Sequence, residues 1–188
     1  MGQVAADNIT VPRNWDDHYS NSANLDLDPA PLLVEAAEML PPGHALDLAC
    51  GPGRNALYLA RLGWQVTAVD SSPAAIGLLT ERAVGLAIHA HIADLEQHQF
   101  AIAPAAYDLI CDFFYLQRDL FPSIRDGVGP GGVFAGAIHL FDESRPSVFS
   151  MHPGELRREF HGWKILFYSE SAEPNHTRRA ARIIARRA

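Results

Sequence analysis

Two glycines and an acid form the first spacing in this chain that could do chemistry. Residues 46–55 read LDLACGPGRN, and Asp70 closes the next apolar, β-branched run. Glycine at a strand-to-helix turn lets bare backbone approach a ligand closely. A carboxylate at the end of the second strand can accept hydrogen bonds from both hydroxyls of a ribose. The spacing of Gly51, Gly53 and Asp70 therefore predicts a site for a nucleotide-like ligand.

A further acid, Asp47, lies in the first strand just before this loop and bears on the charge of the ligand. A pyrophosphate would be repelled by that carboxylate, whereas an ammonium or sulfonium group would be attracted. A dinucleotide pattern also expects a third glycine, where the chain has Ala56, which that pattern tolerates. Asp47 therefore favours a sulfonium nucleoside. An NAD(P)-dependent oxidoreductase and a nucleoside-binding module without catalysis stay open as alternatives.

Acids after the third and fourth strands are expected to complete the site. Asp94 can accept from the exocyclic amine of an adenine while Leu95 offers an apolar contact, although Asp94 could instead cap a turn before Gln97. Asp112 and Phe113 face the same cleft by position, although Phe113 and Phe114 could belong to the core. The other positions expected to line the cofactor site lie in the glycine loop and just after Asp70: Ala49, Arg54, Asn55 and Ser71.

The segments that must position these residues alternate between strand and helix patterns. Apolar and β-branched runs predict strands over residues 45–49, 66–70, 86–92, 107–112 and 132–139. Helical spacing predicts helices over residues 54–62, 73–85 and 116–128, with Ser72 as N-cap of the second and Pro122 straining the third. Residues 129–132, GPGG, predict a turn. This alternation predicts a mostly parallel sheet with helices on both faces.

Flanking sequences extend this pattern in both directions. Asp28 and Pro29 are typical of the cap and first turn of a helix, which we expect to run to about Leu40. Later segments predict a helix over residues 154–160 and a strand over 163–169, while residues 178–187 fit either a strand or one helix face. We expect a single domain over residues 1–188, made of an N-terminal arm (1–27) and an α/β core (28–188).

Composition narrows the class of protein. The 188 residues are 48% hydrophobic and 20% charged, which suits a globular domain with a buried core. The chain shows no membrane-spanning apolar run and no secretory leader, and its two cysteines cannot build a disulfide framework, so we expect a cytoplasmic protein. The net charge of −7 argues against nucleic acid as a partner. The nine histidines show no metal-ligand spacing, so no metal is expected.

The set of motifs, taken in order, resembles class I S-adenosylmethionine-dependent methyltransferases. It comprises residues 47–55, Asp70, Asp94 with Leu95, residues 107–110 and residues 129–132. The resemblance implies S-adenosyl-L-methionine as cofactor and a Rossmann-like seven-stranded sheet of order 3-2-1-4-5-7-6 with an antiparallel last strand, which favours a strand at residues 178–187. The fourth strand ends in CDFFY, without the Asn/Asp-Pro-Pro-aromatic signature of enzymes that methylate amino groups of nucleic acids, so base methylation is disfavoured.

Two further stretches are similar to the TehB-type tellurite methyltransferase family, namely residues 53–60 (GRNALYLA) and 154–158 (GELRR) with the later Gly-Trp pair. In that family a His-Arg pair between the last two strands meets an anionic chalcogen substrate. The corresponding stretch here reads NHTR, which implies His176 and Arg178 as catalytic candidates and a small acceptor such as tellurite or selenite. Trp15 and Tyr19 resemble the Trp-Asp-x-x-Tyr segment that closes over the donor in many methyltransferases. Alternatively, they pack the N-terminal arm on the domain.

Overall fold

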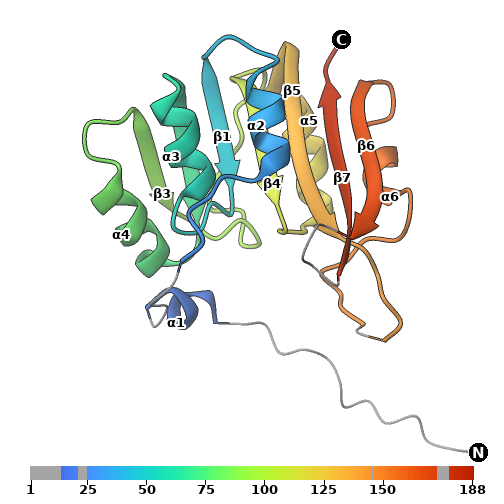
Figure 1. The fold of residues 1–188 in the computed structure, drawn as a ribbon, viewed down its shortest axis with the longest axis horizontal. Coiled ribbons are helices and arrows are strands. Elements are labelled where there is room, and N and C mark those ends of the chain that lie inside the picture. The colour runs from blue at the N-terminus through green and yellow to red at the C-terminus, as the bar shows by residue number, and fades with distance from the viewer. Residues whose placement is uncertain (1–13, 21–24, 145, 173–177) are drawn as a thin grey trace, which may run out of the picture.

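The described residues form seven strands in one sheet, in the order β3-β2-β1-β4-β5-β7-β6 (Figure 1). The structure, a computed structural model, describes residues 14–20, 25–144, 146–172 and 178–188. Strands β1 to β5 pair in parallel, and β7 is antiparallel to both of its neighbours. The strands are β1 (His44–Leu48), β2 (Gln65–Asp70), β3 (Ile88–Ile92), β4 (Tyr107–Phe113), β5 (Val128–His139), β6 (Lys164–Ala172) and β7 (Arg179–Arg186). The predicted fold class, strand order and antiparallel last strand are confirmed.

Helices cover both faces of this sheet. The buried side chains of α2, α3 and α4 share one core layer with the strands, and those of α5 and α6 share the other. The helices are α1 (Trp15–Ser20), α2 (Pro31–Ala37), α3 (Arg54–Arg61), α4 (Pro73–Arg82), α5 (Phe121–Gly127) and α6 (Glu155–Glu159), with a 3-10 turn η1 (Arg118–Leu120). Within the described ranges, no helix has the length and apolar character needed to cross a bilayer.

The starts of α3 and α4 lie at the ends of the strands that precede them. Ser72 caps α4, since its Oγ accepts from the Ala75 N–H at 3.1 Å, and Pro73 occupies the first turn as predicted. Gly53 precedes α3 with a φ of 87°, a left-handed conformation that suits the sharp bend from β1 into the helix. The carboxyl ends of β1 and β2 therefore share one edge of the sheet with two helix N-termini.

The helix expected from Asp28 to Leu40 is shorter than predicted. It begins at Pro31 with Ala30 as the preceding cap residue, and it ends at Ala37. The prediction placed the first-turn proline two residues too early, because Pro29 and Pro31 both fit that position by type. The N–H of Ala30 donates instead to the side chain of Asn55 at 3.0 Å, which fixes where the helix starts.

Two predictions for the region between β4 and β5 are wrong. Pro122 does not strain a long helix: α5 starts at Phe121, so the proline lies in its first turn, where no N–H is needed. Residues 129–132 are not a turn between elements but an irregular part of β5. Pairing with β4 passes from Tyr107↔Val128 to Leu109↔Val133, so the extra residues of β5 form a bulge.

Candidate functional site

The loop between β1 and α3 is tied directly to the end of β2. The Gly51 N–H donates to Asp70 Oδ2 at 2.8 Å, and the Cys50 N–H donates to the Val69 carbonyl at 3.0 Å. Asp70 Oδ1 also accepts from the N–H of Ser72 at 2.9 Å. The carboxylate predicted to meet a ribose thus also holds the glycine loop against the second strand.

Both glycines of this loop are required by close neighbours as well as by backbone conformation. Gly51 has a φ of 54°, and a Cβ there would lie 2.7 Å from the Tyr19 hydroxyl. Gly53 has a φ of 87°, and a Cβ there would lie 2.2 Å from Leu79 Cδ1. Ala49, at a φ of 50°, adds a third left-handed residue to the loop. The loop therefore presents bare backbone at the carboxyl end of β1.

Three carboxylates are buried at this edge. Asp47, Asp70 and Asp112 expose only 1%, 7% and 2% of their surface. Burial raises the pKa of Asp47 to about 7, raises that of Asp70, and holds that of Asp112 well above its usual value. Among the described residues, no ion pair joins any of the three to a basic side chain; the ion pair of Arg54 is with Asp26, at 3.0 Å.

The bonds that Asp47 makes explain why this acid can remain buried in the first strand. Its Oδ2 accepts from the Ala56 N–H at 3.0 Å, in the first turn of α3. Its Oδ1 accepts from the thiol of Cys111 at 3.3 Å, across the pairing of β1 with β4. Burial also raises the pKa of the Cys50 thiol well above its usual value, so that cysteine is held as the thiol.

Helix α1 lies at the same edge, beside the start of α4 (Figure 1). Asp16 Oδ1 accepts from the Ser72 hydroxyl at 2.7 Å and from the Ala74 N–H at 2.9 Å. These hydrogen bonds, the one from Ala74 foremost, lower the pKa of Asp16. Trp15 and Tyr19 stack with ring centroids 6.0 Å apart. The helix therefore packs on the domain, as the alternative reading expected, and places Tyr19 next to Gly51. Closure of this segment over a donor stays a prediction.

Asp16 is the site residue that sequence reasoning missed. It is the acid of the Trp-Asp-x-x-Tyr segment, but its partners lie 56 and 58 residues further along the chain. No local pattern reveals such a contact. The available signal was the N-terminus of α4 itself, which attracts a carboxylate through its free N–H groups and its dipole.

At the adenine end, Asp94 caps a turn. Its Oδ1 accepts from the N–H groups of Glu96 at 2.9 Å and Gln97 at 3.3 Å, as the alternative reading expected. Leu95 is buried, and Ser71 is exposed just after Asp70. These positions share the carboxyl-end edge, and their contact with a cofactor stays a prediction.

The other predicted residues have mixed surroundings. Asn55 is buried and uses its Oδ1 to hold the start of α2, so it positions an element. The Arg54 side chain is 25% exposed and pairs with Asp26. Asp112 Oδ1 accepts from the Tyr115 N–H at 3.3 Å, and half-buried Phe113 packs against the core as the alternative reading allowed.

Of the two residues predicted to hold the acceptor, His176 and Arg178, the structure describes only Arg178. Arg178 comes just before β7 and is half-buried, with its Nε buried and without a hydrogen-bond partner in the described parts of the chain. His176 lies outside the described residues. No group of three His, Cys, Asp or Glu side chains suited to a metal ion occurs within the described ranges.

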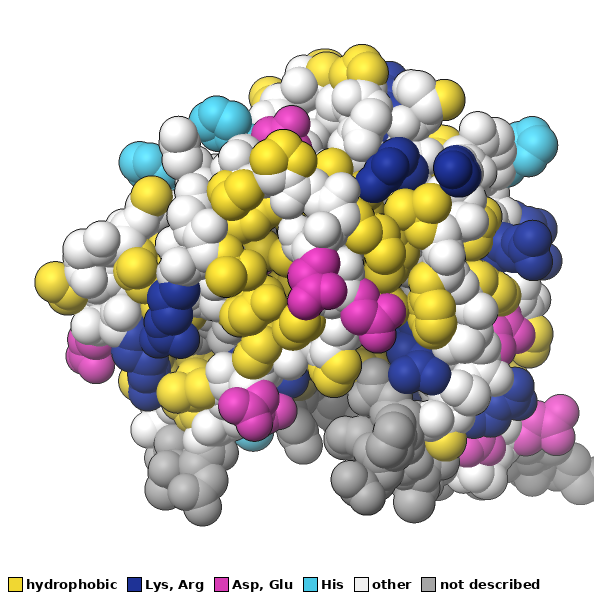
Figure 2. All heavy atoms as spheres, turned by 45° about the horizontal axis from the view of Figure 1, so that its top comes forward, with side chains coloured by type: hydrophobic (Ala, Val, Ile, Leu, Met, Phe, Trp, Pro, Cys, Tyr) yellow, Lys and Arg dark blue, Asp and Glu magenta, His cyan; other side chains and the backbone are white. Residues whose placement is uncertain are grey.

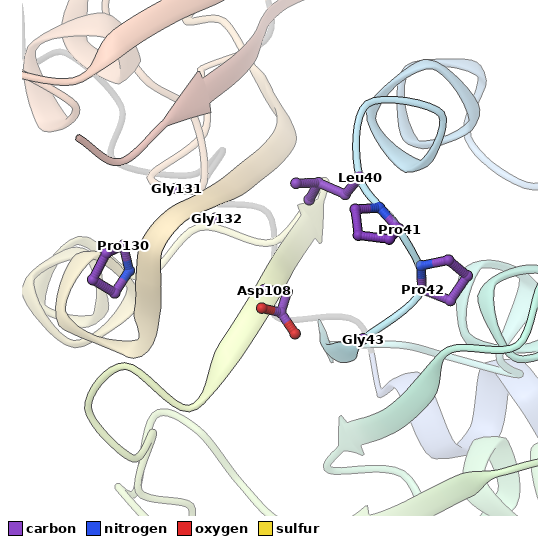
Figure 3. A pocket seen from close by; sticks show the side chains of 8 residues that line it. All are labelled: Leu40, Pro41, Pro42, Gly43, Asp108, Pro130, Gly131 and Gly132. Atoms are coloured by element: carbon purple, nitrogen blue, oxygen red, sulfur yellow. The ribbon is translucent and has the colours of Figure 1, made fainter.

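A pocket at the opposite edge of the sheet contains none of the predicted site residues. It lies at the amino ends of β1 and β4, where Pro41 and Pro42 from the loop before β1 and Pro130 from β5 lie around Asp108 (Figure 3). Asp108 Oδ2 accepts there from the His44 N–H at 2.8 Å, which ties the start of β1 to β4. Ligands of open parallel sheets bind at the carboxyl ends instead.

The residues at the carboxyl-end edge fit a cationic sulfur nucleoside. The three buried acids, none of which forms an ion pair within the described residues, can ionise beside a bound positive charge, and the glycine loop offers bare backbone next to them. The strand order is that of the Rossmann-like fold, which solved S-adenosylmethionine-dependent methyltransferases share.

The comparisons with known proteins identify the family. The profile of the family described as "Tellurite resistance protein TehB" matches residues 14–185, so the chain belongs to the TehB family. A probable S-adenosyl-L-methionine-dependent methyltransferase TehB of Haemophilus influenzae strain 10810 is 30% identical over 174 residues, which cover 86% of this chain and 59% of the relative. The corresponding protein of strain KW20 is 32% identical over 157 residues, which cover 77% and 54%.

Solved structures agree with this assignment. TehB from Haemophilus influenzae has a TM-score of 0.73 and 25% identity, covering 93% of this chain and 67% of that one. A methyltransferase from Mesorhizobium loti, at 17% identity and a TM-score of 0.68, covers 86% of this chain and 100% of that one and shows the fold alone. The chain spans little more than half the length of the curated relatives from Haemophilus.

Proposed function

We propose that this chain transfers a methyl group from S-adenosyl-L-methionine to a small molecule. The group of three buried carboxylates at the ends of β1, β2 and β4 carries the proposal, because it attracts a cationic nucleoside and disfavours a pyrophosphate. When bound, S-adenosyl-L-methionine supplies an electrophilic methyl carbon: a lone pair of the acceptor forms the new bond while the carbon–sulfur bond breaks and its electron pair stays on sulfur, leaving S-adenosylhomocysteine.

Three acids, Asp47, Asp70 and Asp94, are proposed to hold the donor. Asp70 accepts from the ribose hydroxyls, Asp94 accepts from the adenine amine, and Asp47 attracts the cationic end. A carboxylate oxygen accepts more than one hydrogen bond, so the bonds from Gly51 and Ser72 leave Asp70 with capacity for a ribose.

The remaining proposed contacts surround these acids. Tyr19 and Trp15 on α1 cover the loop from one side, where the Tyr19 hydroxyl already lies next to Gly51. Asp112 and Phe113 border the donor at the end of β4. The loop backbone and its neighbours supply the other contacts: Ala49, Arg54, Asn55, Ser71 and Leu95.

The proposed acceptor is a chalcogen oxyanion such as tellurite or selenite. The family description supports this class, and so does Arg178, a half-buried cation at the start of β7. A soft anion brings its own lone pair, so the site must bind it, orient it and exclude water, with little acid–base work. His176 and Arg178 are the residues that we propose to hold it.

The surface in Figure 2 gives no support to a nucleic-acid acceptor. On this side, which carries α2 and α3, the Lys and Arg side chains lie in separate groups, with hydrophobic and acidic side chains between them. A nucleic-acid backbone needs a continuous basic track. A small acceptor remains the proposal, and a cytoplasmic location remains a prediction.

Calorimetry and a transfer screen test the proposed function. We expect S-adenosylhomocysteine to bind and NADH and NADPH not to bind; the reverse would favour an oxidoreductase. Radiolabelled methyl groups should then pass to at least one member of a panel of selenite, tellurite, thiols and small amines. Tight donor binding without transfer to any of them would instead support a nucleoside-binding module.

A matched pair of variants tests the acceptor contact. Arg178→Gln should raise the KM for the acceptor by about tenfold, the scale of one charged hydrogen bond, and leave the affinity for S-adenosylhomocysteine unchanged. Arg179→Gln is the control, because the Arg179 side chain is exposed and donates to the Glu170 carbonyl. His176→Ala should slow turnover without affecting donor affinity. Equal effects of the two arginine variants would remove Arg178 from the site.

A further inference from the structure

The turn after β4 contains an aromatic residue in an unfavourable backbone conformation. Phe114 has a φ of 69°, which bulky side chains rarely adopt because of the steric cost. Its N–H donates to the Ala137 carbonyl at 2.7 Å, so the turn is fastened to the neighbouring strand. Such strained residues persist where the surrounding structure holds them, and they concentrate at functional sites.

The ring of Phe114 stacks on His139, the last residue of β5. The ring centroids are 4.6 Å apart and the planes are inclined by 28°. Phe114 is nevertheless 37% exposed, while His139 is half-buried and its Nδ1 is buried. The strained turn therefore leaves the phenyl ring of this pair partly exposed at the strand end.

The position of this pair in the sheet relates it to the proposed donor site. Leu48 pairs with Asp112, and Phe113 pairs with Ala137. Phe114 therefore comes two residues after Asp112, the buried acid of β4. The donor loop lies on one side, at the end of β1. On the other side, the long segment from β5 to α6 leaves the same edge (Figure 1).

We infer that Phe114 and His139 form the wall of the acceptor site that faces the transferred methyl group, with His139 as a specificity-determining residue. The inference rests on the proposed function, since it assigns the acceptor side of that site. The Phe114 ring shields the reacting atoms from water and offers an aromatic face to a cationic sulfonium. The His139 imidazole can donate a hydrogen bond to an oxygen of the acceptor and so fix its lone pair toward the methyl carbon.

A second aromatic–imidazole pair continues this wall outward. Phe141 and His152 have ring centroids 5.2 Å apart. Met151 joins the two pairs, since its N–H donates to the His139 carbonyl at 2.9 Å and its carbonyl accepts from Phe141 at 2.8 Å. The segment that follows β5 is thus folded back on the strand end, next to the proposed acceptor site.

The first experiment uses the wild-type protein and needs no acceptor. The probe is S-adenosyl-L-methionine with a ¹³C-labelled S-methyl group, and the readout is the nuclear Overhauser effect from its protons to ring protons of selectively labelled Phe and His. We expect contacts to the Phe114 or His139 ring, which disappear in Phe114→Ala and His139→Ala respectively. Bound donor without contact to either ring overturns the inference and leaves donor binding intact. A lack of donor binding instead defeats the proposed function.

The second experiment separates a contact with the acceptor from a structural role. His139→Ala should raise the KM for selenite by about tenfold, the scale of one hydrogen bond, with S-adenosylhomocysteine affinity unchanged, and His139→Gln should restore part of the loss. His161→Ala is the control, because this exposed histidine precedes β6 at the opposite edge. A KM that is unchanged in His139→Ala overturns the role of His139.

Phe114→Gly tests the ring without damaging the turn. Glycine adopts the φ of 69° freely, so this variant should fold at least as stably as the wild type while its KM for selenite rises. An unchanged KM together with unchanged methyl contacts to the remaining His139 ring would show that the phenyl ring has no part in the acceptor site.

Discussion

The two halves of the carboxyl-end edge are built in different ways. The donor half, at the ends of β1 and β2, is held by carboxylates that accept from backbone N–H groups, as Asp70 does from Gly51. The acceptor half, at the ends of β4 and β5, is built from stacked rings such as Phe114 on His139. Hydrogen bonds from backbone N–H groups to carboxylates fix the conformation of the loop for one ligand. Aromatic side chains, in contrast, can be substituted without disturbing the hydrogen bonds of the strands. The donor half therefore defines the class, and the acceptor half defines the substrate.

The charges of the two halves also differ. In the donor half Asp47 and Asp70 are buried, and neither forms an ion pair with a basic side chain among the described residues. Beside the acceptor half, an acid is paired with an arginine: Arg118 donates to Glu155 at 2.6 Å. A cationic ligand thus favours ionisation of the two acids in the donor half, whereas the acceptor half, where burial raises the pKa of Asp112 well above its usual value, leaves little negative charge to repel an anion.

The largest expected effect lies in the donor half, at Gly53. A Cβ there meets the buried Leu79 side chain at 2.2 Å, and the φ of 87° adds backbone strain. Gly53→Ala should lower the free energy of unfolding by about 2–4 kcal/mol and weaken donor binding, as chemical denaturation and calorimetry can measure. Gly63→Ala is the matched control. Its φ is 93° but its Cβ would meet nothing closer than 3.9 Å, so it should lose only about 1 kcal/mol. Equal losses would show that Leu79 moves aside freely.

Asp70 should have the next largest effect, on binding more than on folding. Asp70→Asn should weaken S-adenosylhomocysteine binding by about 1–3 kcal/mol, because a charged hydrogen-bond acceptor is lost. Asp108→Asn is the control, since Asp108 also accepts a backbone N–H, at 2.8 Å, but at the opposite edge of the sheet. Calorimetric titration should show a change for Asp70 only. Unchanged affinity in Asp70→Asn would remove this acid from the donor site.

The same contrast explains how much could be predicted from the sequence. The donor loop and Asp70 could be predicted because both belong to one strand–helix–strand unit, and the Ser72 cap because it depends on the first turn of its own helix. The strand order followed from family resemblance, and the structure confirms it. The contacts of Asp16 and the stacking of Phe114 on His139 could not be predicted, because they join segments far apart in the sequence. The positive φ of Phe114 could not be predicted either, since phenylalanine rarely adopts it.

Asp47 should make the donor half respond to pH. Its folded pKa is raised to about 7 by burial, so the folded protein holds a proton that the unfolded chain releases near the ordinary pKa of 3.8. The stability of the donor-free protein should therefore fall as the pH rises between these values, and Asp47→Asn should flatten that slope. The ammonium group of the ligand favours the ionised acid, so S-adenosylhomocysteine should bind more tightly as the pH rises through about 7, with proton release.

Calorimetry in buffers of different ionisation enthalpy measures that release. In Asp47→Asn the proton count should drop toward zero, while Asp70 and Cys111, which surround the acid, are retained. The affinity of the variant should no longer increase with pH. A wild-type affinity that is independent of pH would show that Asp47 keeps its charge whether or not the donor is bound.

A smaller effect is expected where α1 joins the donor half. Asp16→Ala removes the bonds to Ser72 and Ala74, so Tyr19 is no longer held at Gly51. Donor binding should weaken severalfold while the melting temperature changes little, because α1 contributes no buried residue to the core. Asp17→Ala is the control, since Asp17 is exposed on the same helix. If both variants bind S-adenosylhomocysteine like the wild type, α1 does not contribute to the donor half.

The smallest effect is expected at the ion pair that supports the acceptor half. Glu155 accepts from Arg118 and from the His152 N–H at 2.8 Å, so Glu155→Gln should loosen the segment that carries the outer ring pair. Because such pairs near the surface contribute about 0–1 kcal/mol, stability should change little, and the KM for selenite should rise by roughly two- to threefold. Glu159→Gln breaks the comparable pair with Arg125 away from this segment and should leave that KM unchanged. Donor affinity should stay constant in both variants. A loss of donor affinity in Glu155→Gln would mean that the two halves are coupled, and the division of the site into a fixed donor half and a variable acceptor half would be wrong.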